Sequence, residues 1–247
     1  NRNGQNHSLS IQEPDFLFLP TKHPQNAVRL RDIRYENRSS VKRGLLSLDS
    51  RIHLGSSTII GTDIRRLSWQ SDLSGLPYAR LMAIASSSQL TNARKQQEIG
   101  TLLLRSPMHY RLRHLVFSGL DGAQLRARAH LVYPGAQIGN VSNPLALLSL
   151  WSLLSGQANL RLNPAMVGAV EHWYLRDLAH IRNSQVLAKV TPLLLDRLKQ
   201  AGLLRLQNGD YAIDVDLAHG NATINGAPIQ QVSQSIFMAL VASSRGL

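Results

Sequence analysis

Short runs in the first half of the chain alternate apolar and polar residues. In residues 27–35, AVRLRDIRY, valine and leucine fall on one face of an extended strand and two arginines fall on the other. The alternation changes phase at Asp32, which indicates a β-bulge. Comparable runs cover residues 45–55 and 57–69, with turn residues between them. The pattern predicts an antiparallel meander.

Several turns are visible in the sequence. Residues 109–119 and 125–133 alternate clearly, and Asp121-Gly122 between them supplies the positive φ that a tight hairpin needs. Asn208-Gly209 gives the same signal nearer the C-terminus and precedes another alternating strand. Further turns are predicted at Gly220-Asn221 and at Asn225-Gly226.

Helical periodicity dominates the second half. Asn143 and Asn163 each precede a proline, the signature of an N-cap followed by the first helical residue, and Gly202 is placed to stop a helix. Helices are predicted over residues 77–97 (with a polar middle), 143–156, 163–181, a segment that ends at residue 201, and 230–245; a short strand is predicted over 158–163.

The order of these elements, strands first and helices later, predicts an α+β protein rather than alternating βαβ units. We expect a long curved antiparallel sheet with helices packed on one face. Residues 1–143 form a mainly β region. Residues 144–247 form a helical region, closed by a C-terminal hairpin that joins the sheet, and the whole is expected to be one continuous domain.

Charge is the strongest feature of the composition. The 247 residues carry a formal net charge of +12, which favours an anionic partner such as nucleic acid, phospholipid headgroups or another polyanion. A basic surface that binds no partner would give the same net charge. The chain has no cysteine, which excludes disulfides, thiol catalysis and cysteine-ligated zinc.

Arginines recur in pairs with a spacing of two along predicted strands, so the members of each pair share a face. If the strands are neighbours, the guanidinium groups form a surface suited to phosphate or carboxylate, although charged residues that keep an outer sheet face soluble give the same pattern. The candidate anionic-ligand face consists of Arg29, Arg31, Arg111, Arg113, Arg126 and Arg128.

The predicted helix over residues 143–156 is apolar nearly all round. Such a helix packs against the sheet, or it lines a groove for an acyl chain or rests against a membrane. The candidate apolar groove consists of Leu147, Leu150, Trp151 and Leu154.

The region around residues 184–217 also has the order of a winged helix-turn-helix, with a helix, a Gly-Leu-Leu corner and a two-stranded wing. The helix is mostly leucine and valine where a recognition helix needs polar side chains. The wing carries Asp210, Asp214 and Asp216, which would repel phosphates. Nucleic-acid binding is therefore the alternative rather than the preferred function.

The closing segment resembles the C-terminal region of the bacterial YdgA-like family. The resemblance rests on Gly202-Leu203-Leu204, Asn208-Gly209-Asp210-Tyr211, Gly220 and Asn225-Gly226, and upstream on LSLDSRIHLGSSTIIGTDIRRLSW and ANLRLNPAMVGAV. It implies the periplasmic part of an envelope protein anchored in the inner membrane, with no catalytic residues to transfer. Because the chain starts at Asn1 and has no long apolar run, the anchor is expected upstream.

No serine-hydrolase elbow, Walker loop, dinucleotide fingerprint or His-Glu-x-x-His motif occurs, and the nine histidines are scattered. We therefore expect no enzyme activity, no cofactor and no metal. The predicted function is binding or scaffolding, with a lipid or another anionic envelope component as the partner. A homodimer is a further option, and a hydrolase that lacks these motifs is the remaining rival.

Overall fold

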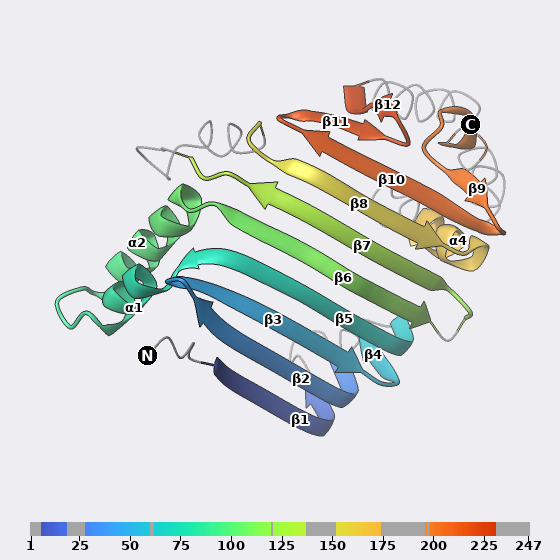
Figure 1. Ribbon diagram of the computed structural model, residues 1–247. Coiled ribbons are helices and arrows are strands. Elements are labelled where there is room, and N and C mark those ends of the chain that lie inside the picture. Colours follow the sequence, from blue (N-terminus) through green and yellow to red (C-terminus); the bar gives the residue numbers. More distant parts are fainter. Residues whose placement is uncertain are drawn as a thin grey trace.

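The computed structural model describes residues 6–18, 28–59, 62–119, 121–136, 152–173, 196 and 198–230. One antiparallel sheet of 12 strands dominates it, which confirms the predicted α+β class built on a large antiparallel sheet (Figure 1). The main path is β1 (Asn6–Phe18), β2 (Val28–Lys42), β3 (Leu45–Leu54), β5 (Thr62–Pro77), β6 (Met108–Gly119), β7 (Gln124–Tyr133), β8 (Ser155–Leu162), β10 (Asp210–Ala218), β11 (Asn221–Ile224) and β12 (Ala227–Pro228). Off this path, β4 (Ser57–Ile59) pairs with β2 and β5, and β9 (Arg205–Gln207) pairs with β10.

Tight turns join many of these strands. Two consecutive positive φ angles, the mark of a type I′ turn, occur at Arg43-Gly44, Asn208-Gly209, His219-Gly220 and Asn225-Gly226. The second and fourth confirm the predicted turns. The third lies one residue earlier than predicted, because Asn221 already pairs with Ala218 in the hairpin.

The backbone of β2 is irregular at Asp32, which has a φ of +51°. Asp32 and the opposed Pro14 form no ladder pair, but the register is the same before and after them, from Glu13 opposite Ile33 to Asp15 opposite Arg31. No extra residue is inserted, so the predicted β-bulge is wrong and Asp32 marks a local kink.

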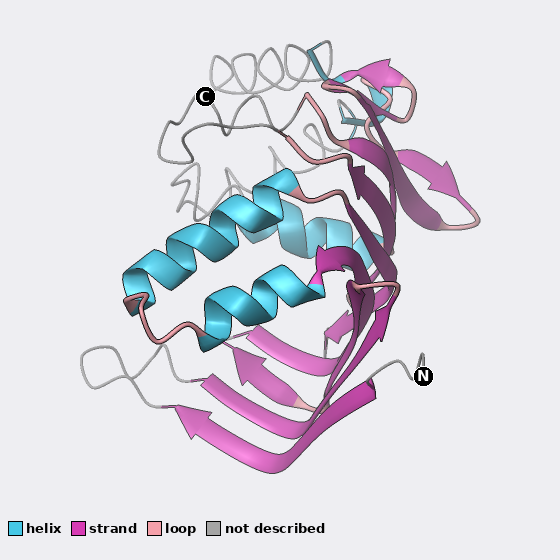
Figure 2. Ribbon diagram, turned by 60° about the vertical axis from the view of Figure 1, so that its left-hand side comes forward, coloured by secondary structure: helices cyan, strands magenta, loops and turns pink. Residues whose placement is uncertain are grey.

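The pairing register gives the two faces of the sheet opposite chemical character, because directly opposed residues share a face. One row across the sheet is polar: Ser8, Arg38, Asp49, Asp72, Arg111, His130, Gln157 and Asp216. A row on the opposite face is apolar: Ile11, Tyr35, Ile52, Trp69, Leu115, Ala127, Leu160 and Ile213. The sheet is curved, and α1 (Tyr78–Ser86) and α2 (Asn92–Arg105) lie on its concave side (Figure 2).

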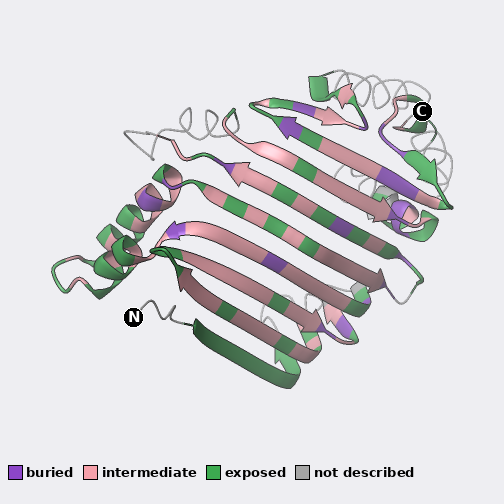
Figure 3. Ribbon diagram, in the orientation of Figure 1, coloured by how far each residue is buried: buried purple, intermediate pink, exposed green. Residues whose placement is uncertain are grey.

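The best-packed core of the described residues lies where α4 (Pro164–Trp173) meets β7, β8 and β10. Most sheet residues are only half-buried, and the fully buried positions are few (Figure 3). The core cluster consists of Ala123, Leu162, Met166, Val167, Leu204 and Tyr211. It therefore joins α4 to the C-terminal strands and to the β6–β7 turn.

Asn163 is the N-cap of α4, as predicted. Its Oδ1 accepts hydrogen bonds from the Met166 and Gln124 N–H groups, both at 2.9 Å, and its Nδ2 donates to the Gly122 carbonyl at 2.8 Å. Replacement by alanine removes all three bonds, so we expect Asn163→Ala to lower the free energy of unfolding by about 2 kcal/mol in urea titrations. Asn163→Asp keeps both acceptor bonds and should lose about half as much. A loss below about 0.5 kcal/mol for the alanine variant would contradict this role.

The predicted helix over residues 77–97 is two helices. α1 ends at Ser86, residues 87–91 are not helical, and Thr91 caps α2 by accepting from the Arg94 N–H at 3.3 Å. The serines between them compete for backbone hydrogen bonds, which explains the break. α2 then continues to Arg105, eight residues beyond residue 97 (105 − 97).

The end of the predicted helix over residues 143–156 is wrong. Ser155 and Gly156 belong to β8, opposite Val132 and Leu131 of β7 and opposite Ala218 and Leu217 of β10. Pairing on both sides overrides the local helical pattern. Residues 143–151 lie outside the described residues.

The helix before the C-terminal hairpin ends as predicted at Gly202, which has a φ of +74°. The N–H of Leu203 donates to the Leu198 carbonyl at 2.9 Å, which closes the last turn. The predicted helical segments over residues 174–181 and 231–245 lie outside the described residues.

Candidate functional site

The six arginines of the predicted anionic face do not form one cluster. Arg111 and Arg113 on β6 lie beside Arg126 and Arg128 on β7. The pair on β2, Arg29 and Arg31, is separated from them by β3 and β5. The strand order therefore assembles four of the six residues.

Two of the six are neutralised within the protein. Arg29 binds Asp15 through two hydrogen bonds of 2.7 and 3.2 Å, and Arg113 binds Asp72 through bonds of 2.5 and 2.9 Å. The hydrogen bond from Arg29, aided by the nearby charges, lowers the pKa of Asp15 below its ordinary value. The hydrogen bond with Asp72 raises the pKa of Arg113.

The remaining arginines on β6 and β7 are not neutralised. Among the described residues, Arg111, Arg126 and Arg128 make no ion pair or side-chain hydrogen bond with another side chain. All three are exposed. They can therefore offer their full set of N–H donors to a ligand.

Arg126 also faces a like charge. It is the direct partner of Arg161 on β8, and opposed like charges in a sheet are destabilising. Arg161 is held in place by its Nη1, which donates to Gln207 Oε1 at 2.5 Å. No acidic side chain of the described residues bonds to either guanidinium group, so an anion bound between them would relieve the repulsion.

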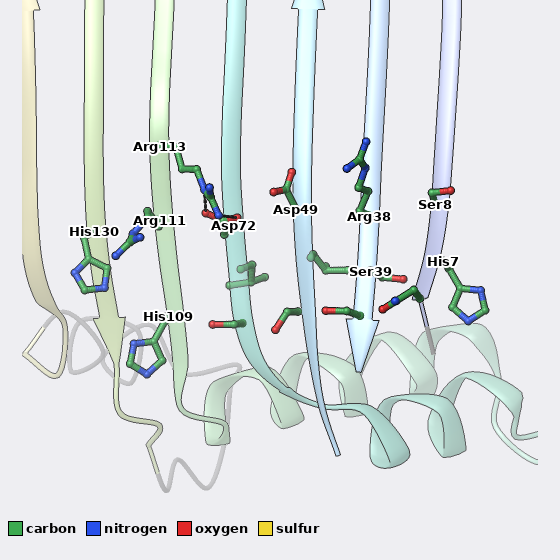
Figure 4. Close-up of a pocket in the computed structure, with 16 residues that line it drawn as sticks. His7, Ser8, Arg38, Ser39, Asp49, Asp72, His109, Arg111, Arg113 and His130 are labelled. Atoms are coloured by element: carbon green, nitrogen blue, oxygen red, sulfur yellow. Dashed lines mark hydrogen bonds and ion pairs between the residues drawn. The ribbon is translucent and has the colours of Figure 1, made fainter. Parts of the chain in front are cut away.

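Two adjoining hollows lie on the polar face of the sheet. The first has a volume of about 690 Å³ and runs from β1 to β7; the second has about 500 Å³ and runs from β6 to β10. Both are lined by Arg111, Arg113 and His130, so they form one continuous depression across the strands. We call it the arginine groove, and Figure 4 shows its first part.

Serine side chains and three histidines, His7, His109 and His130, complete the groove. The rings of His109 and His130 are stacked, with centroids 6.5 Å apart and planes inclined by 17°, beside Arg111 (Figure 4). The serines of the groove lining are Ser8, Ser39, Ser40, Ser47 and Ser74.

Most acidic side chains of the groove are occupied by neighbours. Asp72 binds Arg113, Asp214 accepts from Asn159 Nδ2, and Asp49 lies 3.3 Å from Arg51 Nε. Although Asp49 Oδ1 is buried, its contact with Arg51 is too poorly aligned to count as a hydrogen bond. The unpaired positive charge is therefore concentrated on β6, β7 and β8.

The predicted apolar groove is not built by the described residues. Leu147, Leu150 and Trp151 lie outside them. Leu154 is half-buried in the turn before β8, where its carbonyl accepts from the His219 N–H at 3.1 Å.

Another depression of about 590 Å³ lies between α1 and α2. Arg80, Arg94 and Arg105 line it together with Glu98, above a floor that includes Ile84 and Leu102. It is smaller than the arginine groove and contains its own carboxylate, which makes it a weaker anion site.

The described residues contain one hydroxyl–imidazole pair, Ser68 Oγ and His114 Nε2 at 3.1 Å. No carboxylate among them bonds to the other ring nitrogen, so the third member of a catalytic triad is missing. The same residues hold no group of three or more potential metal ligands, and none of their helices is long and apolar enough to cross a membrane.

Several groove residues were not predicted from the sequence: Arg38, Asp49, Asp72 and His130. Each occupies a polar position of an alternating strand, which is the only signal the sequence offers for it. Their relation to Arg111 depends on strand order and register.

No family model matches this chain, and comparisons with curated proteins and with solved structures give no match either.

Proposed function

We propose that this chain is a non-enzymatic domain that binds an anionic, phosphate-bearing component of the bacterial envelope through the arginine groove. In this proposal it is the periplasmic part of a protein anchored in the inner membrane, as the resemblance to the YdgA-like family implies. The observation that carries the binding function is the set of uncompensated arginines on the polar face: Arg111 and Arg128 line the groove, and the opposed pair Arg126 and Arg161 lies beside it on β7 and β8.

The division of the sheet into faces supports this assignment. α4 packs on the apolar face against Leu160 and Ile213, and we propose that the helical segments as a set cover this face. The polar face would then remain open to ligands. Phosphate groups match the planar fork of arginine through paired hydrogen bonds.

The position of the C-terminal hairpin does not favour the winged-helix alternative. β10 pairs with β8 from Tyr211 to Ala218, so the segment that would be the wing is a strand inside the sheet. Asp214 and Asp216 line the β10 side of the groove, so we propose that phosphate groups bind on its β6 and β7 side, at Arg111 and Arg128.

The proposal predicts that binding depends on β7. Arg126→Gln/Arg128→Gln should weaken binding of sodium polyphosphate at least about tenfold, because it removes two charge-assisted contacts of about 1.5–3 kcal/mol each. Affinity is measured by titration calorimetry from about 50 to about 300 mM salt, and the salt dependence should become shallower in the variant. Vesicles with phosphatidylglycerol test whether the phosphate is a lipid headgroup.

The matched control is Arg80→Gln/Arg94→Gln, which removes the same charge from α1 and α2. It should bind within about twofold of the unmodified protein, since only the long-range field changes. Equal losses in both variants, or a loss only in the control, would place the site elsewhere. Tighter binding to duplex DNA than to polyphosphate at equal salt would favour the nucleic-acid alternative.

A further inference from the structure

Strand β1 forms an open edge of the sheet. It is 13 residues long, every residue is exposed, and among the strands that the structure describes it pairs only with β2 (Figures 1 and 3). Its unpaired backbone N–H and C=O groups can accept another strand.

Proteins usually protect such edges, and β1 has little protection. The strand contains no lysine or arginine, although the whole chain is strongly basic. Its apolar side chains are exposed, among them Leu9 at 55% and Ile11 at 50%. A long edge with exposed apolar side chains and no basic residues is suited to pairing with a further strand.

We infer that β1 is the interface of a homodimer, in which two copies pair antiparallel about a twofold axis through Ser10. This register places Leu9 opposite Ile11 of the second copy, and His7 opposite its Glu13. Ser8 then faces Gln12 of the second copy. In this register apolar residues oppose apolar residues, polar residues oppose polar residues, and the imidazole of His7 opposes the carboxylate of Glu13.

Other registers match less well. A twofold axis at Gln12 would place Ile11 opposite Glu13 and Leu9 opposite Asp15. Pro14, which has no N–H to donate, limits the strand contact at its far end. From Asn6 to Pro14 the paired segment spans about 30 Å at about 3.4 Å per residue.

The two faces of the sheet continue across this axis. Leu9 and Ile11 are opposite Asn37 and Tyr35 of β2, on the apolar face. Both copies would place these leucines and isoleucines on the same side of the joined sheet, so a single apolar face extends through the dimer.

The other end of the sheet path explains why the assembly would close at two copies. β12 consists of Ala227 and Pro228 only, which is too short for further strand addition. When β1 of one copy pairs with β1 of the other, the interface is isologous, and neither copy has an unpaired β1 edge left. The interface is small, so we expect a dissociation constant of roughly micromolar order.

A cross-linking experiment tests the axis directly, because the chain has no cysteine of its own. Opposed residues of an antiparallel pair have Cα atoms about 4.5–5.5 Å apart, within the range of a disulfide. Ser10→Cys should therefore form a covalent dimer on mild oxidation. Leu17→Cys, on the same strand but outside the paired segment and 54% exposed, should remain monomeric. Dimers of Leu17→Cys without dimers of Ser10→Cys would overturn the register.

Sedimentation velocity of the unmodified protein from about 1 to about 100 μM should show a monomer–dimer equilibrium. Leu9→Lys/Ile11→Lys should raise the dissociation constant at least tenfold, whereas Leu17→Lys should not change it. Both variants alter exposed side chains, and circular dichroism checks that they fold.

Charge exchange tests the pairing of His7 with Glu13. His7→Glu and Glu13→Lys should each weaken the dimer, and the double variant should restore it. A strictly monomeric protein over the whole concentration range, or a double variant no better than its parents, would overturn the inference.

Discussion

Asn225→Asp should lower the free energy of unfolding by about 3 kcal/mol or more, a large fraction of a typical domain's stability. Asn225 is 5% exposed and has a φ of +51°. Its Nδ2 donates to the carbonyls of Gly202 (2.8 Å), Leu203 (2.9 Å) and Ala212 (3.4 Å), and its Oδ1 accepts from the Asp214 N–H at 2.8 Å. Aspartate would place a buried negative charge against three carbonyl oxygens.

Asn208→Asp is the matched control. Asn208 has nearly the same φ, +53°, at the corresponding position of another type I′ turn, but its side chain is exposed. The control should change the free energy of unfolding by less than about 0.5 kcal/mol. Similar midpoints for the two variants in urea would show that the hydrogen-bond set of Asn225 does not stabilise the sheet.

Gly156→Ala should also destabilise the protein severely, by about 3 kcal/mol or more, because β7 and β8 would have to separate. A Cβ on Gly156 would lie 2.9 Å from Leu131 Cα and still closer to the His130 carbonyl oxygen, and the φ of +149° disfavours any side chain. The midpoint of thermal unfolding measures the loss. His130 lines the arginine groove, so any folded fraction should also bind polyphosphate more weakly.

Gly209→Ala isolates the contribution of backbone conformation. Gly209 has a φ of +86°, and a Cβ there would have no atom within 4 Å. We expect a loss of only about 1 kcal/mol. If both alanine variants lost the same amount, the close approach of β8 to β7 would contribute nothing to the effect of Gly156→Ala.

Alternation and turn chemistry predicted most of the strands correctly. The hairpin of β6 and β7, the turn at Asn208-Gly209 and the cap at Asn163 all depend on neighbours in the chain. β1 was not predicted although residues 7–11 alternate, because no short hairpin signal such as Asn-Gly joins it to β2. The predicted strand over residues 158–163 was too short at its start, because pairing with both β7 and β10 extends β8 back to Ser155.

The candidate site could be predicted only in part. The spacing of two placed Arg111 and Arg113, and likewise Arg126 and Arg128, on common faces, and the structure makes these pairs neighbours. Arg29 and Arg31 are not neighbours of these pairs in the structure. Arg29 and Arg113 form ion pairs with aspartates that lie 14 and 41 residues away along the chain. Ion pairs between residues so far apart in the sequence cannot be predicted from a local sequence pattern.

By itself, the sequence determined the position of several tight turns, the basic charge of the chain, and which arginines of one strand share a face. The turns follow from the φ preferences of glycine and asparagine, and the shared faces follow from the backbone period of two. Only the tertiary structure decided which arginines are left without a carboxylate, which strand forms the long open edge, and that Arg126 faces Arg161. Strand order and register set these features, and both are fixed by packing and pairing across the whole sheet rather than by adjacent residues.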